Sequence, residues 1–191
     1  MRVLIACEYS GTVREAFKAR GHYAMSCDLL PTEQPGNHYQ GDVFDIINDG
    51  WDLMIAHPPC TDIAVSGAAW FKEKIADGRQ QAALDFVRLL MAADIPQIAI
   101  ENPVSVISSK IRKPDQIIQP WMFGHMEQKS TCLWLKGLPK LVETNNVKEE
   151  MMLLPKKDRE RIHYTPPGPN RWKIRSTTFK GIALAMASQW G

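Results

Sequence analysis

Ile98-Ala99-Ile100-Glu101-Asn102-Pro103 is the stretch that decides the fold class. Its three apolar residues show no polar alternation, which is typical of a strand buried on both faces of a parallel sheet. The polar and turn-forming residues that follow predict that this strand ends at Ile100. Upstream, Arg79–Ala93 has apolar residues at three- and four-residue spacing and is predicted to be a helix. A helix that leads into a buried strand indicates an α/β architecture.

The same alternation of strands and helices continues outward in both directions. Further strands are predicted at Arg2–Ala6, Tyr23–Cys27, His38–Gln40, Trp51–Ala56 and Lys129–Leu135. Further helices are predicted from Ser10 to about Arg20 and over Gly181–Trp190. We therefore expect a single α/β domain over residues 1–191, with a mostly parallel sheet.

The composition favours a globular protein of the cytoplasm. Of the 191 residues, 45% are hydrophobic and 23% are charged, and no apolar run is long enough to span a bilayer. The four cysteines include no C-x-x-C pair, so we expect reduced thiols and neither a disulfide framework nor a metal site.

The charge is distributed unevenly along the chain. The net charge is +2, but Lys156 to Arg175 contains seven basic and two acidic residues and so carries +5. Tyr164 and Trp172 lie among these charges. Basic residues interleaved with aromatic ones suit a phosphate backbone and an unstacked base, so a basic insert at about 140–175 is expected to bind nucleic acid. A solvated surface loop is the alternative. The residues expected to bind nucleic acid are Lys156, Lys157, Arg159, Arg161, Arg171, Trp172, Lys173 and Arg175.

Polar or reactive residues follow each of the first five predicted strands. They are Cys7-Glu8-Tyr9-Ser10-Gly11, Asp28, Asp42, His57-Pro58-Pro59-Cys60 and Glu101-Asn102-Pro103, in strand order. Ligands of open parallel sheets bind beyond the carboxyl ends of the strands. Asp28 suits the two hydroxyls of a ribose, and Asp42 suits an adenine amino group. Helix caps or turn acids are the alternative for both aspartates.

Cys60 and Glu101 are the two candidates for chemistry. Two prolines precede Cys60, so its thiol is expected on a rigid turn, where a nearby positive charge would favour the nucleophilic thiolate. Glu101 is expected to be desolvated at the end of a buried strand, which would raise its pKa and let it donate a hydrogen bond to a ring nitrogen. A buried turn cysteine and a structural glutamate are the alternatives.

Pro59-Cys60 and Glu101-Asn102 resemble the two catalytic motifs of the DNA (cytosine-5)-methyltransferases, particularly short phage-type members. The two motifs are 41 residues apart, similar to the family's separation. Ala6–Gly11 resembles the turn that binds S-adenosylmethionine. Gln128-Lys129-Ser130-Thr131 resembles the strand motif that carries basic residues toward the substrate. Ser176-Thr177-Thr178 with Gly181-Ile182-Ala183 resembles the motif that completes the cofactor pocket.

This resemblance implies a Rossmann-like methyltransferase fold with a very small target-recognition insert, S-adenosylmethionine as cofactor and DNA as partner. It implies the catalytic set Cys60, Glu101, Asn102 and Lys129. It implies the cofactor-binding set Ala6, Cys7, Glu8, Tyr9, Ser10, Gly11, Asp28, Leu29, Asp42, Val43, Pro58 and Thr177. Cys60 would add to C6 of cytosine while Glu101 binds N3, so that C5 accepts the methyl group, and a duplex target would be flipped out of the stack.

Three other functions stay open. Only about 40 residues separate the Lys129–Leu135 strand from the last motif, which leaves a free or modified pyrimidine nucleotide as an acceptor for the same chemistry. His57-Pro58-Pro59-Cys60 partly resembles the motif of methyltransferases that act on amino groups of adenine or cytosine. A non-catalytic nucleic-acid-binding protein of the same fold is the third possibility.

Overall fold

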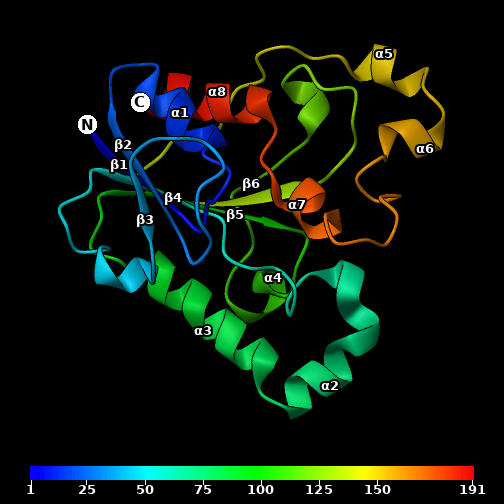
Figure 1. The fold of residues 1–191 in the computed structure, drawn as a ribbon. Coiled ribbons are helices and arrows are strands. Elements are labelled where there is room, and N and C mark those ends of the chain that lie inside the picture. The colour runs from blue at the N-terminus through cyan, green and yellow to red at the C-terminus, as the bar shows by residue number, and fades with distance from the viewer.

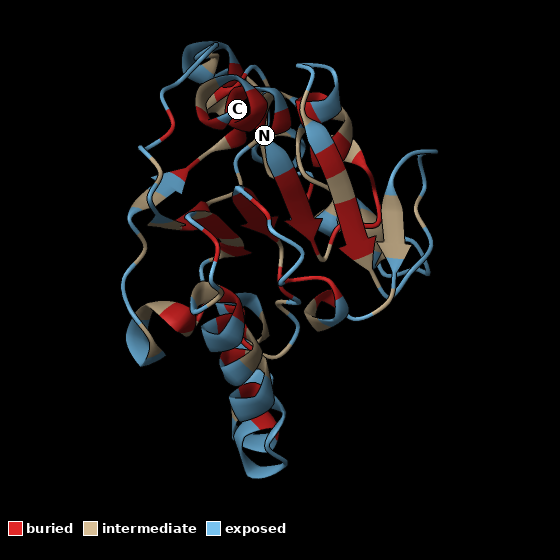
Figure 2. Cartoon of the chain, turned by 90° about the vertical axis from the view of Figure 1, so that its left-hand side faces the viewer, coloured by how far each residue is buried: buried red, intermediate tan, exposed pale blue.

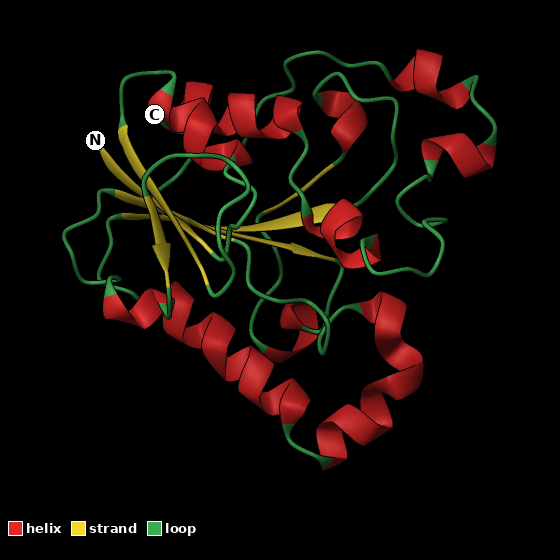
Figure 3. Ribbon diagram, viewed as in Figure 1, coloured by secondary structure: helices red, strands yellow, loops and turns green.

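A seven-stranded, mixed and mostly parallel sheet forms the centre of the computed structural model, which describes residues 1–191 (Figure 3). The strand order is β3-β2-β1-β4-β5-β7-β6. Strands β1 to β5 are parallel, and β7 is antiparallel to both β5 and β6. Their bounds are β1 (Arg2–Ala6), β2 (Tyr23–Asp28), β3 (His38–Gln40), β4 (Leu53–Ala56), β5 (Gln97–Pro103), β6 (Gln116–Ile118) and β7 (Thr131–Lys136).

Helices cover both faces of this sheet (Figure 1). Helices α1 (Thr12–Lys18) and α8 (Lys180–Trp190) pack together over one face, and α3 (Arg79–Met91) lies over the other with α4 (Ile107–Lys110) and the 3-10 turn η1 (Val43–Asp45). The remaining short elements are η2 (Val65–Trp70), α2 (Phe71–Ala76), η3 (Pro120–Met122), α5 (Lys148–Met152), α6 (Lys156–Arg159) and α7 (Arg171–Ser176).

The sheet separates two hydrophobic layers. In β1, Val3 and Ile5 face the layer under α1 and α8, whereas Leu4 and Ala6 face the layer under α3. Because both faces are covered, the central strands are apolar at nearly every position, as in other parallel sheets with helices on both sides. Figure 2 shows the buried residues concentrated in the central strands and on the inward faces of the helices.

The structure corrects the predicted end of the fifth strand. β5 does not stop at Ile100 but continues through Glu101 and Asn102 to Pro103. The extension is stabilised by β7, which places Leu133 opposite Glu101 and Cys132 opposite Asn102. The two polar residues therefore belong to a hydrogen-bonded strand and not to a free turn, which fixes their directions.

Other predicted bounds shift by a few residues, and several short elements were not predicted. Strand β4 begins at Leu53 and β7 begins at Thr131, so Lys129 precedes its strand. The segment predicted as a basic insert contains α5, α6 and α7, joined by loops. Only four residues between 140 and 175 are buried: Leu141, Met151, Ile162 and Thr165. None of the helices combines the length and apolar character needed to cross a lipid bilayer.

Candidate active site

Cys60 lies on a tight turn just beyond the carboxyl end of β4. Its carbonyl oxygen accepts hydrogen bonds from the backbone N–H groups of Ile63 (3.2 Å) and Ala64 (2.8 Å). The buried Lys74 of α2 donates its ammonium to the carbonyl of Thr61, next to the cysteine. The thiol is half-buried. Hydrogen bonds within the turn and from Lys74 of α2 therefore fix the backbone around Cys60.

Asn102 connects this turn to β5. Its side chain is only 1% exposed, and its Nδ2 donates to the carbonyl oxygen of Pro58 at 2.9 Å. Proline has no N–H, but its carbonyl still requires a partner when buried. Asn102 provides that partner and fixes the Pro58-Pro59-Cys60 turn against the neighbouring strand.

His57 and Glu101 form a hydrogen-bonded pair at the same edge of the sheet. Parallel pairing places Ala56 of β4 opposite Ile100 of β5, so the next residue of each chain lies side by side. His57 Nδ1 is 2.8 Å from Glu101 Oε2, and the side chains are only 10% and 14% exposed. The other ring nitrogen of His57, Nε2, is buried without a protein partner.

The charges of this pair differ from the prediction made for Glu101. Burial raises the pKa of Glu101, but the hydrogen bond and charge of His57, with the charge of Lys129, lower it by more, so the pKa lies below its ordinary value. Burial likewise lowers the pKa of His57, but Glu101 and Glu8 outweigh this and raise it. The expected rise in the pKa of Glu101 is therefore wrong, because sequence reasoning left out the histidine beside it.

Opposing charges act on the Cys60 thiol. Burial raises its pKa most, and the nearby Glu101 carboxylate adds to the rise, whereas Lys129 and Arg175 lower it. Lys129 is held in place because its Nζ donates to the carbonyl oxygen of Arg175 at 3.0 Å. The structure therefore brings Cys60, Glu101 and Lys129 together as predicted, and adds His57 and Arg175 to the cluster.

A cavity of about 260 Å³ opens beside this cluster, beyond β1, β2 and β3. It is lined by five residues of the predicted cofactor set, namely Cys7, Asp28, Leu29, Asp42 and Val43. Five further residues line it that sequence reasoning did not assign to a site: Cys27, Gly41, Pro59, Ala83 and Phe86. Ala83 and Phe86 belong to the apolar stripe of α3, which indicated core packing and gave no separate signal of a cavity.

Backbone hydrogen bonds already engage part of each aspartate. Asp28 Oδ1 accepts from the N–H of Leu30, and Asp42 Oδ1 accepts from the N–H of Phe44, where it caps η1. One oxygen of each carboxylate has no such bond. The capping role weighed for these residues is therefore present, and it leaves an oxygen of each carboxylate without a hydrogen bond at the cavity.

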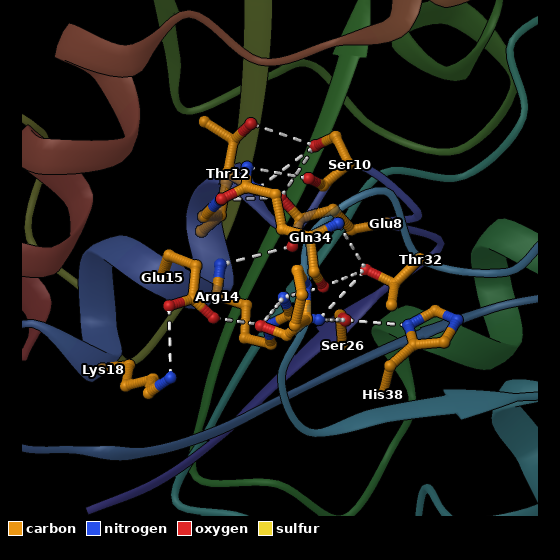
Figure 4. A network of polar contacts seen from close by, with 12 residues as sticks. Glu8, Ser10, Thr12, Arg14, Glu15, Lys18, Ser26, Thr32, Gln34 and His38 are labelled. Carbon is orange, nitrogen blue, oxygen red and sulfur yellow. Dashed lines mark hydrogen bonds and ion pairs between the residues drawn. The ribbon is translucent and has the colours of Figure 1, made fainter.

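The turn after β1 is organised around the start of α1. Glu8 is buried, and its carboxylate accepts from the N–H groups of Val13 (2.6 Å) and Arg14 (3.2 Å), which satisfies unpaired donors of the helix. Ser10 donates to Glu8 and contacts Thr12. These two members of the predicted cofactor set thus act on the helix start, as Figure 4 shows. Ala6 is fully buried in the core.

Arg14 fixes the loop that follows β2. Its side chain is fully buried, and its guanidinium donates to Ser26, Thr32 and the carbonyl oxygen of Gln34 (Figure 4). Gln34 in turn donates to the carbonyl of Ser10. Gly11 allows this close approach, because a Cβ at its position would lie 2.7 Å from Arg14 Nη2. The loop after β2 and the turn after β1, which flank the cavity, are therefore joined by hydrogen bonds.

Helix α7 packs over the turn after β1. The rings of Tyr9 and Trp172 are 5.3 Å apart, and the Tyr9 hydroxyl is 3.1 Å from Ser176 Oγ. Lys173 forms an ion pair with Glu33 at 2.6 Å. Thr177, at the end of α7, donates to the carbonyl oxygen of Lys173. Both Trp172 and Lys173 were predicted to bind nucleic acid, and in the structure their side chains contact Tyr9 and Glu33 of the same chain.

The other predicted nucleic-acid residues are spread over the insert. Lys156 and Lys157 are exposed on α6, and Arg161 is exposed but paired with Glu127. Arg159 and Arg171 are half-exposed. A second cavity of about 280 Å³ lies in this region, lined by Lys157, Asp158, Arg161, Tyr164, Thr165, Pro166 and Ile174. The predicted basic set is therefore not one surface: Arg175 lies close enough to Cys60 for its charge to lower the pKa of the thiol, whereas the lysines of α6 are exposed to solvent.

No protein-family model matches the chain, and no curated protein matches it either.

Proposed function

We propose that this chain is an S-adenosylmethionine-dependent methyltransferase that methylates C5 of cytosine in DNA. The observation that carries the proposal is the cluster at the carboxyl ends of β4 and β5. There, a cysteine on a braced turn meets a glutamate and two cations, beside a cavity that contains two carboxylates. The strand order β3-β2-β1-β4-β5-β7-β6, with β7 antiparallel, is consistent with a methyltransferase fold.

The cavity beside the cluster suits the adenosine part of the cofactor. The free carboxylate oxygen of Asp28 would accept from the ribose hydroxyls, and that of Asp42 from the adenine amino group. Phe86, Ala83 and Pro59 provide apolar walls for the purine ring. S-adenosylmethionine would supply an electrophilic methyl group on a sulfonium.

The cluster suits addition to a pyrimidine followed by methyl transfer. The Cys60 thiolate adds to C6 and forms the S–C6 bond while N3 is protonated, so that C5 becomes nucleophilic. C5 takes the methyl group as the bond from the sulfonium sulfur breaks. Loss of the C5 proton to solvent and return of the N3 proton then restore the ring as the S–C6 bond breaks and the Cys60 thiolate leaves. Lys129 and Arg175 support the first step, because positive charge favours the thiolate.

The insert suits a polyanionic acceptor. The exposed Lys156 and Lys157 would contact phosphates, and the segment from Lys156 to Arg175 carries +5. A duplex target would have to be flipped into the cluster, because a stacked cytosine keeps its C6 and C5 faces covered.

Transfer of tritium from S-[methyl-³H]adenosylmethionine tests the proposal. The acceptors are duplex DNA, single-stranded DNA and dCMP, and digestion with mass spectrometry identifies the methylated base. We expect label in 5-methylcytosine with wild-type protein, none with Cys60→Ala, and wild-type behaviour with Cys132→Ala, whose side chain is buried on β7.

Each alternative function predicts a different outcome of this assay. Label in dCMP but not in DNA would identify a nucleotide-modifying enzyme. Methylation at N4 of cytosine or N6 of adenine would identify an amino-methyltransferase. Incorporation that is equal in wild type and Cys60→Ala would contradict the covalent mechanism, and binding of DNA without any transfer would indicate a non-catalytic protein.

A further inference from the structure

We propose that His57 is a positioning residue that supplies the proton which Glu101 delivers to the pyrimidine ring. The inference rests on the proposed function and adds a residue that the family motifs do not contain at that step. It is carried by the pairing of His57 Nδ1 with Glu101 Oε2 at 2.8 Å.

The two oxygens of Glu101 are in different environments. Oε2 is engaged by His57 and by no other protein group. Oε1 has no hydrogen bond within the protein and is not among the buried unpartnered atoms. One oxygen of the carboxyl group is therefore hydrogen-bonded to the imidazole, while the other has no protein partner and is not sealed from its surroundings. This is the geometry of a relay between a proton holder and a bound ring.

The surrounding charges favour a proton on the histidine. Glu8, from the turn after β1, and Glu101, from β5, favour the imidazolium, whereas burial and Lys129, from the segment before β7, oppose it. Lys129 and His57 both favour the ionised form of Glu101. Both shifts in pKa favour an imidazolium and a carboxylate, joined by the hydrogen bond of 2.8 Å between Nδ1 and Oε2.

Cytosine requires that proton. N3 of neutral cytosine has a lone pair and no hydrogen, so an ionised carboxylate repels it. As the S–C6 bond forms, the electron pair displaced from C5=C6 makes N3 more basic. The Nδ1 proton then passes to the Glu101 carboxyl group, rotation about Cγ–Cδ turns the protonated oxygen toward the ring, and N3 takes the proton. His57 is left neutral, and the proton returns when Cys60 leaves.

His57→Asn separates proton supply from structure. The asparagine amide keeps a hydrogen-bond donor near the position of Nδ1 but does not release a proton at neutral pH. For the methylation assay above, we expect kcat to fall about 100-fold. We expect the Michaelis constant for S-adenosylmethionine to stay unchanged, and the loss of rate at alkaline pH to disappear. His22→Asn, at the opposite end of the sheet, is the matched control and should keep the wild-type rate and pH profile.

A second measurement does not depend on methyl transfer. The ¹⁵N resonances of the His57 ring in the free protein should show the proton on Nδ1 and a pKa above 6.5, and Glu101→Gln should lower that pKa. His22→Asn should leave it unchanged.

The outcomes separate this inference from the proposed function. Wild-type protein that methylates no acceptor overturns both. Methylation by wild type and His57→Asn at equal rates, with the same pH profile, overturns the relay alone. A His57 pKa that does not respond to Glu101→Gln also overturns the relay, even where His57→Asn fails to fold.

Discussion

At the scale of single residues, Asn102 carries much of the geometry around Cys60. Its amide bridges β5 and the turn after β4 in a region from which water is excluded. Asn102→Ala leaves the Pro58 carbonyl without a donor. We therefore expect the free energy of unfolding to fall by about 1–3 kcal/mol, measured by urea denaturation.

A surface asparagine is the control for that substitution. Asn37 is exposed, and its side chain makes no hydrogen bond within the protein. Asn37→Ala should change the free energy of unfolding by less than about 0.5 kcal/mol. A cost for Asn102→Ala that is no larger than this would mean that the bond to Pro58 contributes nothing to the turn.

The His57–Glu101 pair also predicts how stability depends on pH. The raised pKa of His57 contributes stability below its ordinary value of 6.5, and this contribution is lost as the pH rises through the raised pKa. The lowered pKa of Glu101 contributes stability above its ordinary value of 4.5, which is lost as the pH falls through the lowered pKa.

The difference in unfolding free energy between wild type and His57→Asn should therefore be largest between pH 4.5 and pH 6.5 and should decline above this range. Urea denaturation at a series of pH values measures it. A difference that stays constant or grows toward alkaline pH would show that the two side chains do not form an ion pair in the folded protein.

Sequence reasoning found Cys60 and Glu101 because each comes shortly after a run of apolar residues, where core packing does not explain a reactive or charged side chain. It did not assign a role to His57, although a signal was present. Ala56 and Ile100 pair on neighbouring parallel strands, so the next residues, His57 and Glu101, lie side by side. The direction of the pKa shift of Glu101 could not be predicted without that pairing, because it depends on which side chain lies within hydrogen-bonding distance of the carboxylate.

At the scale of elements, the turn between β1 and α1 is shaped by Gly11. Its φ of 72° lies in the left-handed region, and the Arg14 guanidinium occupies the space where a Cβ would project. Gly50 has nearly the same backbone angle, φ 75°, but nothing lies within 4 Å of its missing Cβ. A substitution at Gly50 therefore introduces backbone strain alone, whereas one at Gly11 introduces the same strain and a steric clash with Arg14.

Alanine substitutions at these glycines should differ in cost. Gly50→Ala is expected to lower the free energy of unfolding by about 1–2 kcal/mol from backbone strain alone. Gly11→Ala should cost about 1–3 kcal/mol more, because Arg14 must move. Urea denaturation of both variants measures the difference. Equal costs would show that the Arg14 network does not constrain this turn.

Elements with a clear period were predicted close to their observed bounds, including β1, β2, α1, α3 and α8. Of the short elements, β3 was predicted, but β6 and the helices of the insert were not. Strand β6 has three residues, and α5, α6 and α7 have four to six each, so none is long enough to show a helical or alternating pattern. The extension of β5 to Pro103 depends on pairing with β7, which no local pattern in Glu-Asn-Pro reveals.

At the scale of the whole molecule, the insert and the sheet differ in how much they bury. The central strands are almost entirely buried, whereas residues 140–175 contribute four buried side chains. Segments with few buried contacts open at lower free energy than the global unfolding transition. The insert contacts the rest of the protein through α7, which meets Tyr9 and Glu33, and through hydrogen bonds from its other segments, such as those of Leu141 with Gln116 and of Arg161 with Glu127.

Hydrogen exchange followed by mass spectrometry should reveal this difference. We expect amides in β1, β4 and β5 to exchange slowest, and those between α5 and α7 to exchange faster by several orders of magnitude. Trp172→Ala should increase exchange in the insert without changing it in the strands. Uniform protection across the chain would mean that the insert unfolds together with the sheet.

The positions of the chain ends have a practical consequence. Met1 and Gly191 lie close together, with Met1 at the amino end of β1 and Gly191 against His22 (Figure 1). Cys60 and the cavity lie beyond the carboxyl ends of the strands, at the opposite edge of the sheet. A tag at either end can therefore attach the protein to a sensor surface with the Cys60 edge facing the solution, so that immobilised protein presents the same edge to every compound tested.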